Sequence, residues 1–201
     1  MMKIKDVRDK RYSIDHVLSV YFGVPGSGKS TFAAYLAKKD LKHGSPVWSN
    51  VPITGCYDLD PHKDLGSFMI ADGRVIIDEA GIDYNNRGFK DNFKAHELYW
   101  FKYHRHYECA VDVFSQGWND MDKKIRDLAQ KLYVVKKSIF PFFIVRRTIG
   151  KRVGINELTK EIIDEYFWVP FSRKWIFAPA VWKMFNTLSR KELPPKQWTR
   201  F

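Results

Sequence analysis

The sequence predicts an α/β fold in which helices flank a mostly parallel sheet. An apolar run over residues 17–22 predicts a buried strand, and a glycine-rich turn leads from it into a helical pattern over residues 31–42. A second buried strand, over residues 74–77, ends in two acidic residues, and a third, over residues 110–115, ends in a glutamine. Strands that alternate with helices and end in polar side chains are typical of parallel sheets, which bind ligands at their carboxyl edge.

The glycine-rich turn is the most specific motif of the chain. It matches G-x-x-x-x-G-K-[ST] without a mismatch and consists of Gly23, Val24, Pro25, Gly26, Ser27, Gly28, Lys29, Ser30 and Thr31. In such a P-loop the backbone N–H groups surround a polyphosphate at the N-terminus of the next helix. We expect Lys29 to reach the β- and γ-phosphates of ATP and Ser30 to bind Mg²⁺. The alternative is a glycine turn with a chance lysine, which the flanking strand and helix disfavour.

The strand over residues 74–77 leads into Asp78 and Glu79. At the carboxyl edge of the sheet, Asp78 is expected to hold Mg²⁺, directly or through water. Glu79 is expected to orient and deprotonate an attacking water molecule. A strand that simply ends in surface acids is the alternative. Asp78 follows Lys29 by 49 residues that hold strand and helix patterns, and this spacing favours the catalytic interpretation.

Gln116 ends the strand over residues 110–115. A polar residue at this place in a P-loop ATPase can contact the γ-phosphate or the attacking water as a sensor. The alternative is a glutamine that caps the strand end, and the sequence leaves both open.

The remaining elements follow from local signals. Residues 46–51 predict a strand, residues 53–72 contain turns and a short helix, and residues 95–107 predict a helix. Residues 120–130 predict a helix with Asn119 or Asp120 as its N-cap. Further on, we expect a β-hairpin of residues 131–135 and 142–147, a helix over residues 157–167, a short strand over residues 175–177 and a mobile tail over residues 193–201.

Two histidines in the helix of residues 95–107 raise the question of a metal site. His104 and His106 flank Arg105. Residues two apart lie on different faces of a helix, so a shared metal ion is excluded. We interpret both as surface histidines.

Composition limits the class of protein. Hydrophobic residues make up 45% of 201 residues, enough for a sizeable core. No apolar run approaches the length of a membrane span, and the charged N-terminus lacks the apolar segment of a secretory signal. Cys56 and Cys109 are too few for a disulfide framework and are expected to be reduced thiols in a cytosol.

Charge divides the chain unevenly. Residues 1–122 carry 16 Lys+Arg and 17 Asp+Glu, which is 16 − 17 = −1, whereas residues 123–201 carry 18 and 6, which is 18 − 6 = +12. Such a basic segment attracts nucleic acid or an anionic membrane surface, although a merely solvated surface is the alternative. We expect an ATPase domain over residues 1–150 and a basic C-terminal extension over residues 151–201.

Several motifs together resemble the zonula occludens toxin-like (Zot) family, the assembly and export ATPases of filamentous phages. They are the P-loop, Asn50–Ile53, Val75–Ala80, Tyr103–His106, Phe114–Gln116 and Met121–Leu128. The last is the most specific, because general P-loop chemistry does not require it. The resemblance covers about residues 16–150. It implies a RecA-like P-loop NTPase core related to the HerA/FtsK motors, working as a ring-shaped homo-oligomer that moves phage DNA, expected to be single-stranded.

The resemblance also implies roles for individual residues. By it, Lys29, Ser30, Asp78 and Glu79 bind the nucleotide and magnesium and activate water, and Gln116 is the sensor. Candidates for an arginine finger that a neighbouring subunit inserts at the γ-phosphate are Arg105, Arg126 and Arg87. A structural salt bridge is the alternative for each of them.

The chain departs from the family in one respect. Members usually carry a transmembrane helix after the ATPase domain, and here no spanning segment follows the core. We therefore expect a cytoplasmic protein, or one peripheral to the inner face of the host membrane, with a membrane protein or a coat protein as partner.

Two other functions fit part of the pattern. The segment Gly23–Lys29 also resembles the P-loop of nucleoside monophosphate kinases, but those enzymes usually lack the Asp-Glu pair and carry an arginine-rich lid. A non-catalytic adaptor would bind ATP, turn it over negligibly and recruit coat or membrane components through its basic C-terminal part.

Overall fold

The computed structural model describes residues 12–80, 84, 94–155 and 162–185. Its strands are β1 (Leu18–Phe22), β2 (Val47–Ser49), β3 (Tyr57–Asp58), β4 (Arg74–Ile77), β5 (Ala110–Ser115), β6 (Lys131–Lys137), β7 (Phe143–Ile155), β8 (Ile162–Trp168) and β9 (Lys174–Phe177). Its α-helices are α1 (Lys29–Lys42), α2 (Pro61–Asp64), α4 (Ala95–Tyr103) and α5 (Lys123–Leu128). Two 3-10 turns, η2 (Ala178–Ala180) and η3 (Trp182–Met184), follow β9.

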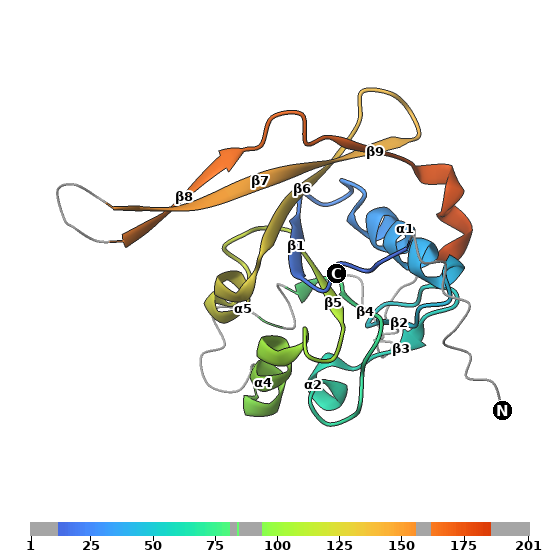
Figure 1. Cartoon of the computed structure of the whole chain (residues 1–201). Helices are drawn as coiled ribbons and strands as arrows, with labels where there is room; N and C mark the ends of the chain where they lie inside the picture. The colour runs from blue at the N-terminus through green and yellow to red at the C-terminus, as the bar shows by residue number, and fades with distance from the viewer. Residues whose placement is uncertain (1–11, 81–83, 85–93, 156–161, 186–201) are drawn as a thin grey trace, which may run out of the picture.

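The nine strands of the described residues form one sheet, in the order β3-β2-β4-β5-β1-β6-β7-β8, with β9 paired to β7 (Figure 1). The pairs from β3 to β6 are parallel, and β7 runs antiparallel to β6, β8 and β9. The predicted α/β class with a mostly parallel sheet and a C-terminal hairpin is confirmed. Because β5 lies between β1 and β4, the end of β5 lies between the P-loop and Asp78.

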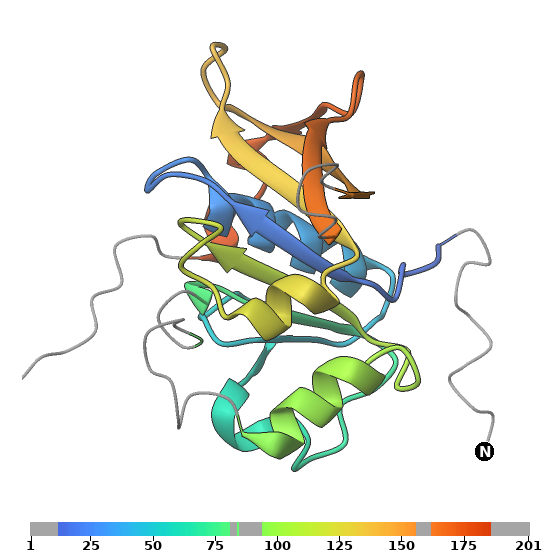
Figure 2. The same ribbon diagram turned by 90° about the vertical axis from the view of Figure 1, so that its left-hand side faces the viewer.

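Helices cover the two faces of the parallel part of the sheet. On one face, Phe32 of α1 packs on a layer that includes Tyr21, Val135 and Ile144. On the other face, α4 and α5 pack on a second layer with Trp100, Phe101 and Ile125 (Figures 1 and 2). Both layers consist of apolar side chains because parallel strands in an α/β fold are buried on both faces. None of the helices within the described ranges is long and apolar enough to cross a membrane.

The structure corrects the helix predicted over residues 157–167. Residues 162–168 form strand β8, which pairs antiparallel with β7 from Ile149↔Trp168 to Ile155↔Ile162, and residues 157–161 lie outside the described part. The run Ile-Ile-Asp-Glu-Tyr-Phe-Trp is rich in β-branched and aromatic residues, which favour a strand. The open edge of β7 provides a pairing partner, so this segment forms a strand and not a helix. The boundary expected after residue 150 falls within β7.

Helix α5 is shorter than predicted and starts later. Its N-cap is Asp122, whose carboxylate accepts a hydrogen bond from the backbone N–H of Lys124 at 2.7 Å, so Asn119 and Asp120 are not the cap. Helix α4 likewise ends at Tyr103 rather than at residue 107. The tail over residues 193–201 lies outside the described residues.

Candidate active site

The P-loop joins β1 to α1 and depends on the backbone freedom of glycine. Gly26 and Gly28 have φ angles of 71° and 99°, in the left-handed region that disfavours side chains. Gly28 is the N-cap residue of α1, and a Cβ atom there would lie 2.6 Å from Cγ2 of Ile144 on β7. The conformation of the loop therefore requires glycine at both positions, and the close approach of β7 leaves no room for a side chain at Gly28.

Lys29 points back onto the loop. Its Nζ donates to the carbonyl oxygens of Gly23 at 2.7 Å and Val24 at 3.3 Å. Burial lowers the pKa of Lys29, and the carboxylates of Asp78 and Glu79 oppose that shift. The predicted lysine thus lies within the field of the predicted acids.

Asp78 follows β4 and lies beside the start of α1. The hydroxyl of Ser30 donates to Oδ2 of Asp78 at 2.9 Å, and the backbone N–H of Glu79 donates to Oδ1 at 2.9 Å. Burial raises the pKa of Asp78, which is 5% exposed, while the hydrogen bonds from Ser30 and Glu79 and the charge of Lys29 oppose the shift. The P-loop serine and the acid 48 residues later are therefore in direct contact.

Asn50, directly after β2, fixes the backbone at Asp78. Its Oδ1 accepts from the N–H of Asp78 at 2.8 Å, and its Nδ2 donates to the carbonyl oxygen of Asp78 at 3.0 Å. From the sequence, Asn50 stood out only as part of the Asn50–Ile53 motif and as a polar residue at the carboxyl end of a strand, and no role followed for it. The strand-end position is the same signal that identified Gln116.

One cavity of about 350 Å³ collects the predicted groups. It is lined by Pro25, Gly26, Gly28, Lys29, Ser30, Thr31, Asp78, Glu79 and Gln116. Glu79 has a φ of 54°, an uncommon left-handed conformation for a residue with a side chain. Three separate elements (the P-loop, the end of β4 and the end of β5) thus contribute to one surface.

The donor set fits magnesium together with a phosphate ligand. Mg²⁺ prefers oxygen donors and is commonly held by one or two protein side chains plus phosphate oxygens and water. The Ser30 hydroxyl and the Asp78 carboxylate supply such oxygens. Within the described part of the chain, no group of three or more His, Cys, Asp or Glu side chains could hold a metal ion.

The candidate finger arginines lie elsewhere. Arg105, in the turn after α4, lines a hollow with residues 13–17, which precede β1. Arg126 on α5 lies 5.6 Å from the ring centroid of Trp118, and its guanidinium donates to Oδ1 of Asn119 at 3.4 Å. Neither is among the described residues that line the P-loop cavity. Arg87 lies outside the described residues, so the choice of finger stays a prediction.

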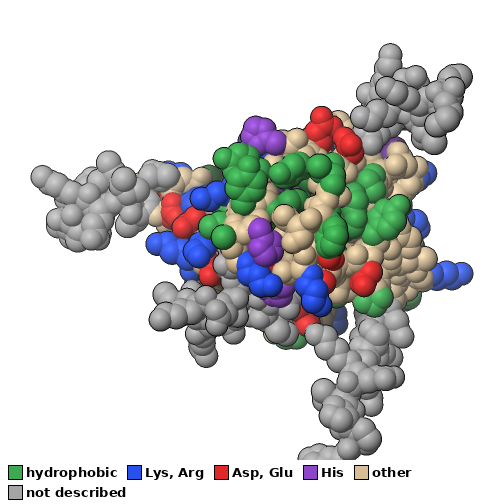
Figure 3. Space-filling model, turned by 90° about the horizontal axis from the view of Figure 1, so that it is seen from below, with side chains coloured by type: hydrophobic (Ala, Val, Ile, Leu, Met, Phe, Trp, Pro, Cys, Tyr) green, Lys and Arg blue, Asp and Glu red, His purple; other side chains and the backbone are tan. Residues whose placement is uncertain are grey.

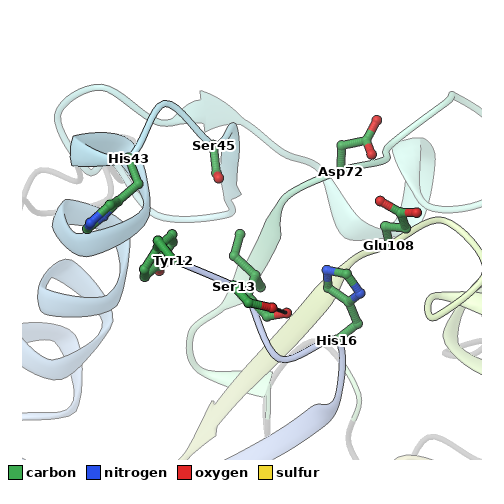
Figure 4. A pocket seen from close by; sticks show the side chains of 8 residues that line it. Tyr12, Ser13, His16, His43, Ser45, Asp72 and Glu108 are labelled. Carbon is green, nitrogen blue, oxygen red and sulfur yellow. Dashed lines mark hydrogen bonds between the residues drawn. The ribbon is translucent and has the colours of Figure 1, made fainter. Parts of the chain in front are cut away.

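A second hollow lies where strands begin rather than end. It is lined by residues that include Tyr12, His16, His43, Asp72 and Glu108 (Figure 4). His16, Asp72 and Glu108 come just before β1, β4 and β5, so this hollow is at the amino edge of the sheet, opposite the P-loop. The Tyr12 ring stacks on His43 with centroids 3.8 Å apart.

His104 is not a surface residue. It is 2% exposed, and its Nδ1 donates to the carbonyl oxygen of Phe101 at 2.7 Å. The helix ends at Tyr103, and the following turn directs His104 inward. The surface interpretation is therefore wrong for His104, while His106 is exposed.

The fold and the site together define an α/β protein with a P-loop between its first strand and first helix. Comparison with known proteins is consistent with this fold. The family model described as "Zonular occludens toxin (Zot)" matches residues 62–170, and the chain belongs to this family. A search of curated proteins found no relative similar in sequence.

Two solved structures illustrate the similarity. The N-terminal domain of zonular occludens toxin from Neisseria meningitidis has a TM-score of 0.56 at 16% identity, covering 86% of this chain and 100% of that chain. This likeness shows a shared fold. The genome packaging NTPase B204 from Sulfolobus turreted icosahedral virus 2, in complex with ATP-gammaS, has a TM-score of 0.47 at 11% identity, covering 75% of this chain and 96% of that one, a weaker likeness.

Proposed function

We propose that this protein is the ATP-hydrolysing motor of phage or prophage assembly and couples hydrolysis to the movement or export of phage DNA. The observation that carries the proposal is the contact between Ser30 and Asp78 in a cavity that also exposes Lys29, Glu79 and Gln116. This is the arrangement expected for a magnesium–nucleotide site at the carboxyl edge of a parallel sheet. Membership of the Zot family supports the phage role.

Each residue of the site would have its own role in ATP binding and hydrolysis. The backbone of residues 23–28 and the Lys29 ammonium would bind the phosphates, and Ser30 and Asp78 would hold the metal. Bound Mg²⁺ would neutralise charge on the β- and γ-phosphate oxygens. Glu79 would accept the proton of a water molecule aligned for in-line attack, and the amide of Gln116 would orient that water or contact the γ-phosphate.

The proposal includes partners. We propose a ring-shaped homo-oligomer, in which Arg105 or Arg126 of one subunit serves its neighbour's site, and single-stranded DNA as the polymer moved. The net charge of +12 over residues 123–201 supports an anionic partner. We propose a place in the cytoplasm or at the inner face of the membrane, with a coat or membrane protein as a further partner.

ATP turnover with and without single-stranded DNA tests the function. Lys29→Ala should weaken nucleotide binding and turnover, and Glu79→Gln should keep nucleotide binding but lower turnover by about 100-fold or more, because a general base contributes that much. Lys42→Ala, an exposed lysine at the other end of α1, is the matched control and should leave both unchanged.

Wild-type turnover that DNA does not stimulate, together with no DNA binding at low salt, would contradict the motor. Phosphate transferred to an added nucleotide instead of released into solution would indicate a kinase. Equal turnover in wild type and Glu79→Gln would contradict the assigned base.

A further inference from the structure

A group of exposed hydrophobic side chains lies at the turn between β6 and β7 and on the adjoining β9. This tip cluster consists of Ile139, Phe140, Phe142, Phe143, Trp175 and Phe177. Ile139, in the turn, is 91% exposed. The turn projects from the end of the sheet farthest from α2 and α4 (Figure 1). Contiguous exposed hydrophobic patches often mark the binding site of a partner.

The register of the strands explains why these side chains share a surface. In the β7–β9 pair, Phe143 lies opposite Phe177 and Val145 lies opposite Trp175. The alternate residues Ile144 and Ile176 point to the other face and are buried in the layer under α1. The exposed side chains are therefore additional to a complete core and are not core residues left uncovered.

Four of the five rings pack on one another, whereas Phe142 contacts Trp182, with ring centroids 6.0 Å apart. Trp175 lies 5.8 Å from Phe140 and 6.3 Å from Phe143 between ring centroids, and Phe143 lies 5.4 Å from Phe177. The interplanar angles of these pairs are 49°, 73° and 51°. Phe143 and Trp175 thus meet edge to face, and the other two pairs are tilted.

Basic side chains lie beside the tip cluster. Lys136 is exposed at the end of β6, just before the turn, and Arg173 is exposed before β9. Lys137 is also exposed, but it lies opposite Ile144 and so points to the other face. Lys136 lies opposite Val145 and so shares the face of Trp175. Residues 131–150 contain five Lys and Arg, residues 169–185 contain three, and neither segment contains Asp or Glu.

We propose that the tip cluster inserts into the surface of an anionic lipid bilayer, with Lys136 and Arg173 at the lipid phosphates. Aromatic side chains favour the membrane interface, and basic side chains beside them are attracted to anionic headgroups. Ile139 is the most exposed side chain of the tip cluster. Transfer of this aliphatic side chain from water to hydrocarbon is favourable. This proposal does not depend on ATP hydrolysis.

Single-stranded nucleic acid is the competing partner for a basic and aromatic surface. Bases bind by stacking on accessible ring faces. In the tip cluster Trp175 and Phe143 contact neighbouring rings, and Ile139, the most exposed side chain of the cluster, offers no π-face. The geometry therefore favours the bilayer, and nucleic acid becomes an outcome of the test.

Sedimentation with lipid vesicles tests the proposal on the full chain. One set of vesicles contains phosphatidylcholine and phosphatidylglycerol, the other phosphatidylcholine alone. The wild type should bind the anionic set more strongly, and Ile139→Asp should lower that affinity about tenfold, because a charge in the interface opposes insertion. Met69→Asp is the matched control: Met69 is 79% exposed and follows α2, at the other end of the molecule. Figure 3 shows that end, where hydrophobic side chains lie among acidic, basic and histidine side chains.

Charge reversal gives a second, independent comparison. Lys136→Glu should weaken binding to anionic vesicles about tenfold, whereas Lys102→Glu, at an exposed lysine of α4, should have little effect. Thermal unfolding and nucleotide binding are measured for every variant, so that a folding defect or a failure of the ATPase proposal is recognised separately.

Three results would overturn the proposal. They are absence of wild-type binding to anionic vesicles, equal binding to neutral and anionic vesicles, and an Ile139→Asp variant that loses affinity for a labelled single-stranded oligonucleotide but keeps its affinity for vesicles. The last result would assign the surface to nucleic acid.

Discussion

Two polar residues of this protein, Asp78 and His104, are buried and are held in place by hydrogen bonds. Asp78 keeps its place because Asn50 binds the backbone on both sides of it and Ser30 binds its carboxylate. His104 is buried with its Nδ1 tied to Phe101, although its neighbours Arg105 and His106 are exposed. Both cases show a polar group whose ionisation is altered by low exposure, and the second can be tested by pH.

Because of His104, we expect the free energy of unfolding to decrease as the pH is lowered from about 6.5. Burial lowers its pKa from 6.5 in the folded state. Above pH 6.5 the imidazole of His104 is neutral in both the folded and the unfolded state. Just below pH 6.5 the imidazole is protonated in the unfolded chain but stays neutral in the folded protein. Stability should therefore be lost as pH falls toward the folded-state pKa, by at most about 1.4 kcal/mol per pH unit.

Urea unfolding at several pH values measures this loss. His104→Asn retains a donor for the Phe101 carbonyl but cannot titrate, so it should reduce the slope. His106→Asn should leave the slope unchanged, because His106 is exposed in the same turn. An unchanged slope in His104→Asn would contradict the assignment.

At the scale of the elements, the P-loop and the β6–β7 hairpin fit against each other without spare volume. A Cβ atom on Gly23 would lie 2.4 Å from the carbonyl oxygen of Val135, and one on Gly28 would lie 2.6 Å from Ile144. The antiparallel strands added beyond β6 therefore form one wall of the P-loop. The glycine pattern of the motif therefore serves this packing, in addition to the phosphate binding that we propose.

Gly28→Ala should destabilise the protein more than Gly44→Ala. Both glycines have positive φ, 99° and 76°, so both substitutions carry a strain of about 1–2 kcal/mol. At Gly44 nothing lies within 4 Å of the new methyl group, whereas at Gly28 it collides with Ile144 and adds about 1–3 kcal/mol of overpacking. Urea unfolding of the two variants measures the difference, and equal losses would show that Ile144 does not restrain the loop.

At the scale of the whole molecule, a buried ion cluster ties the helix after the P-loop to the centre of the sheet. The Arg74 guanidinium, at the start of β4, binds Asp40 of α1 and Asp112 of β5. Burial lowers the pKa of Arg74, but the two carboxylates outweigh it and raise the pKa. Burial also raises the pKa of Asp112, and Arg74 opposes that shift.

Arg74→Met should lower the free energy of unfolding by about 3–5 kcal/mol, because two buried carboxylates lose their cation. Lys131→Met removes the partner of Asp15 in a more exposed pair and should cost less than about 1 kcal/mol. Urea unfolding at neutral pH compares the two. Similar costs would indicate that water enters the Arg74 cluster.

The sequence alone predicted the P-loop, the acids after β4 and the parallel core, because these depend on local backbone conformation and hydrophobic pattern. It did not determine that residues 162–168 become a strand, since an open edge of β7 decided that. Nor did it determine the role of Asn50 or the burial of His104. Only the tertiary structure placed β5 between β1 and β4, bringing Gln116 and Asp78 into one cavity with Lys29, because strand order depends on contacts between segments far apart in the chain.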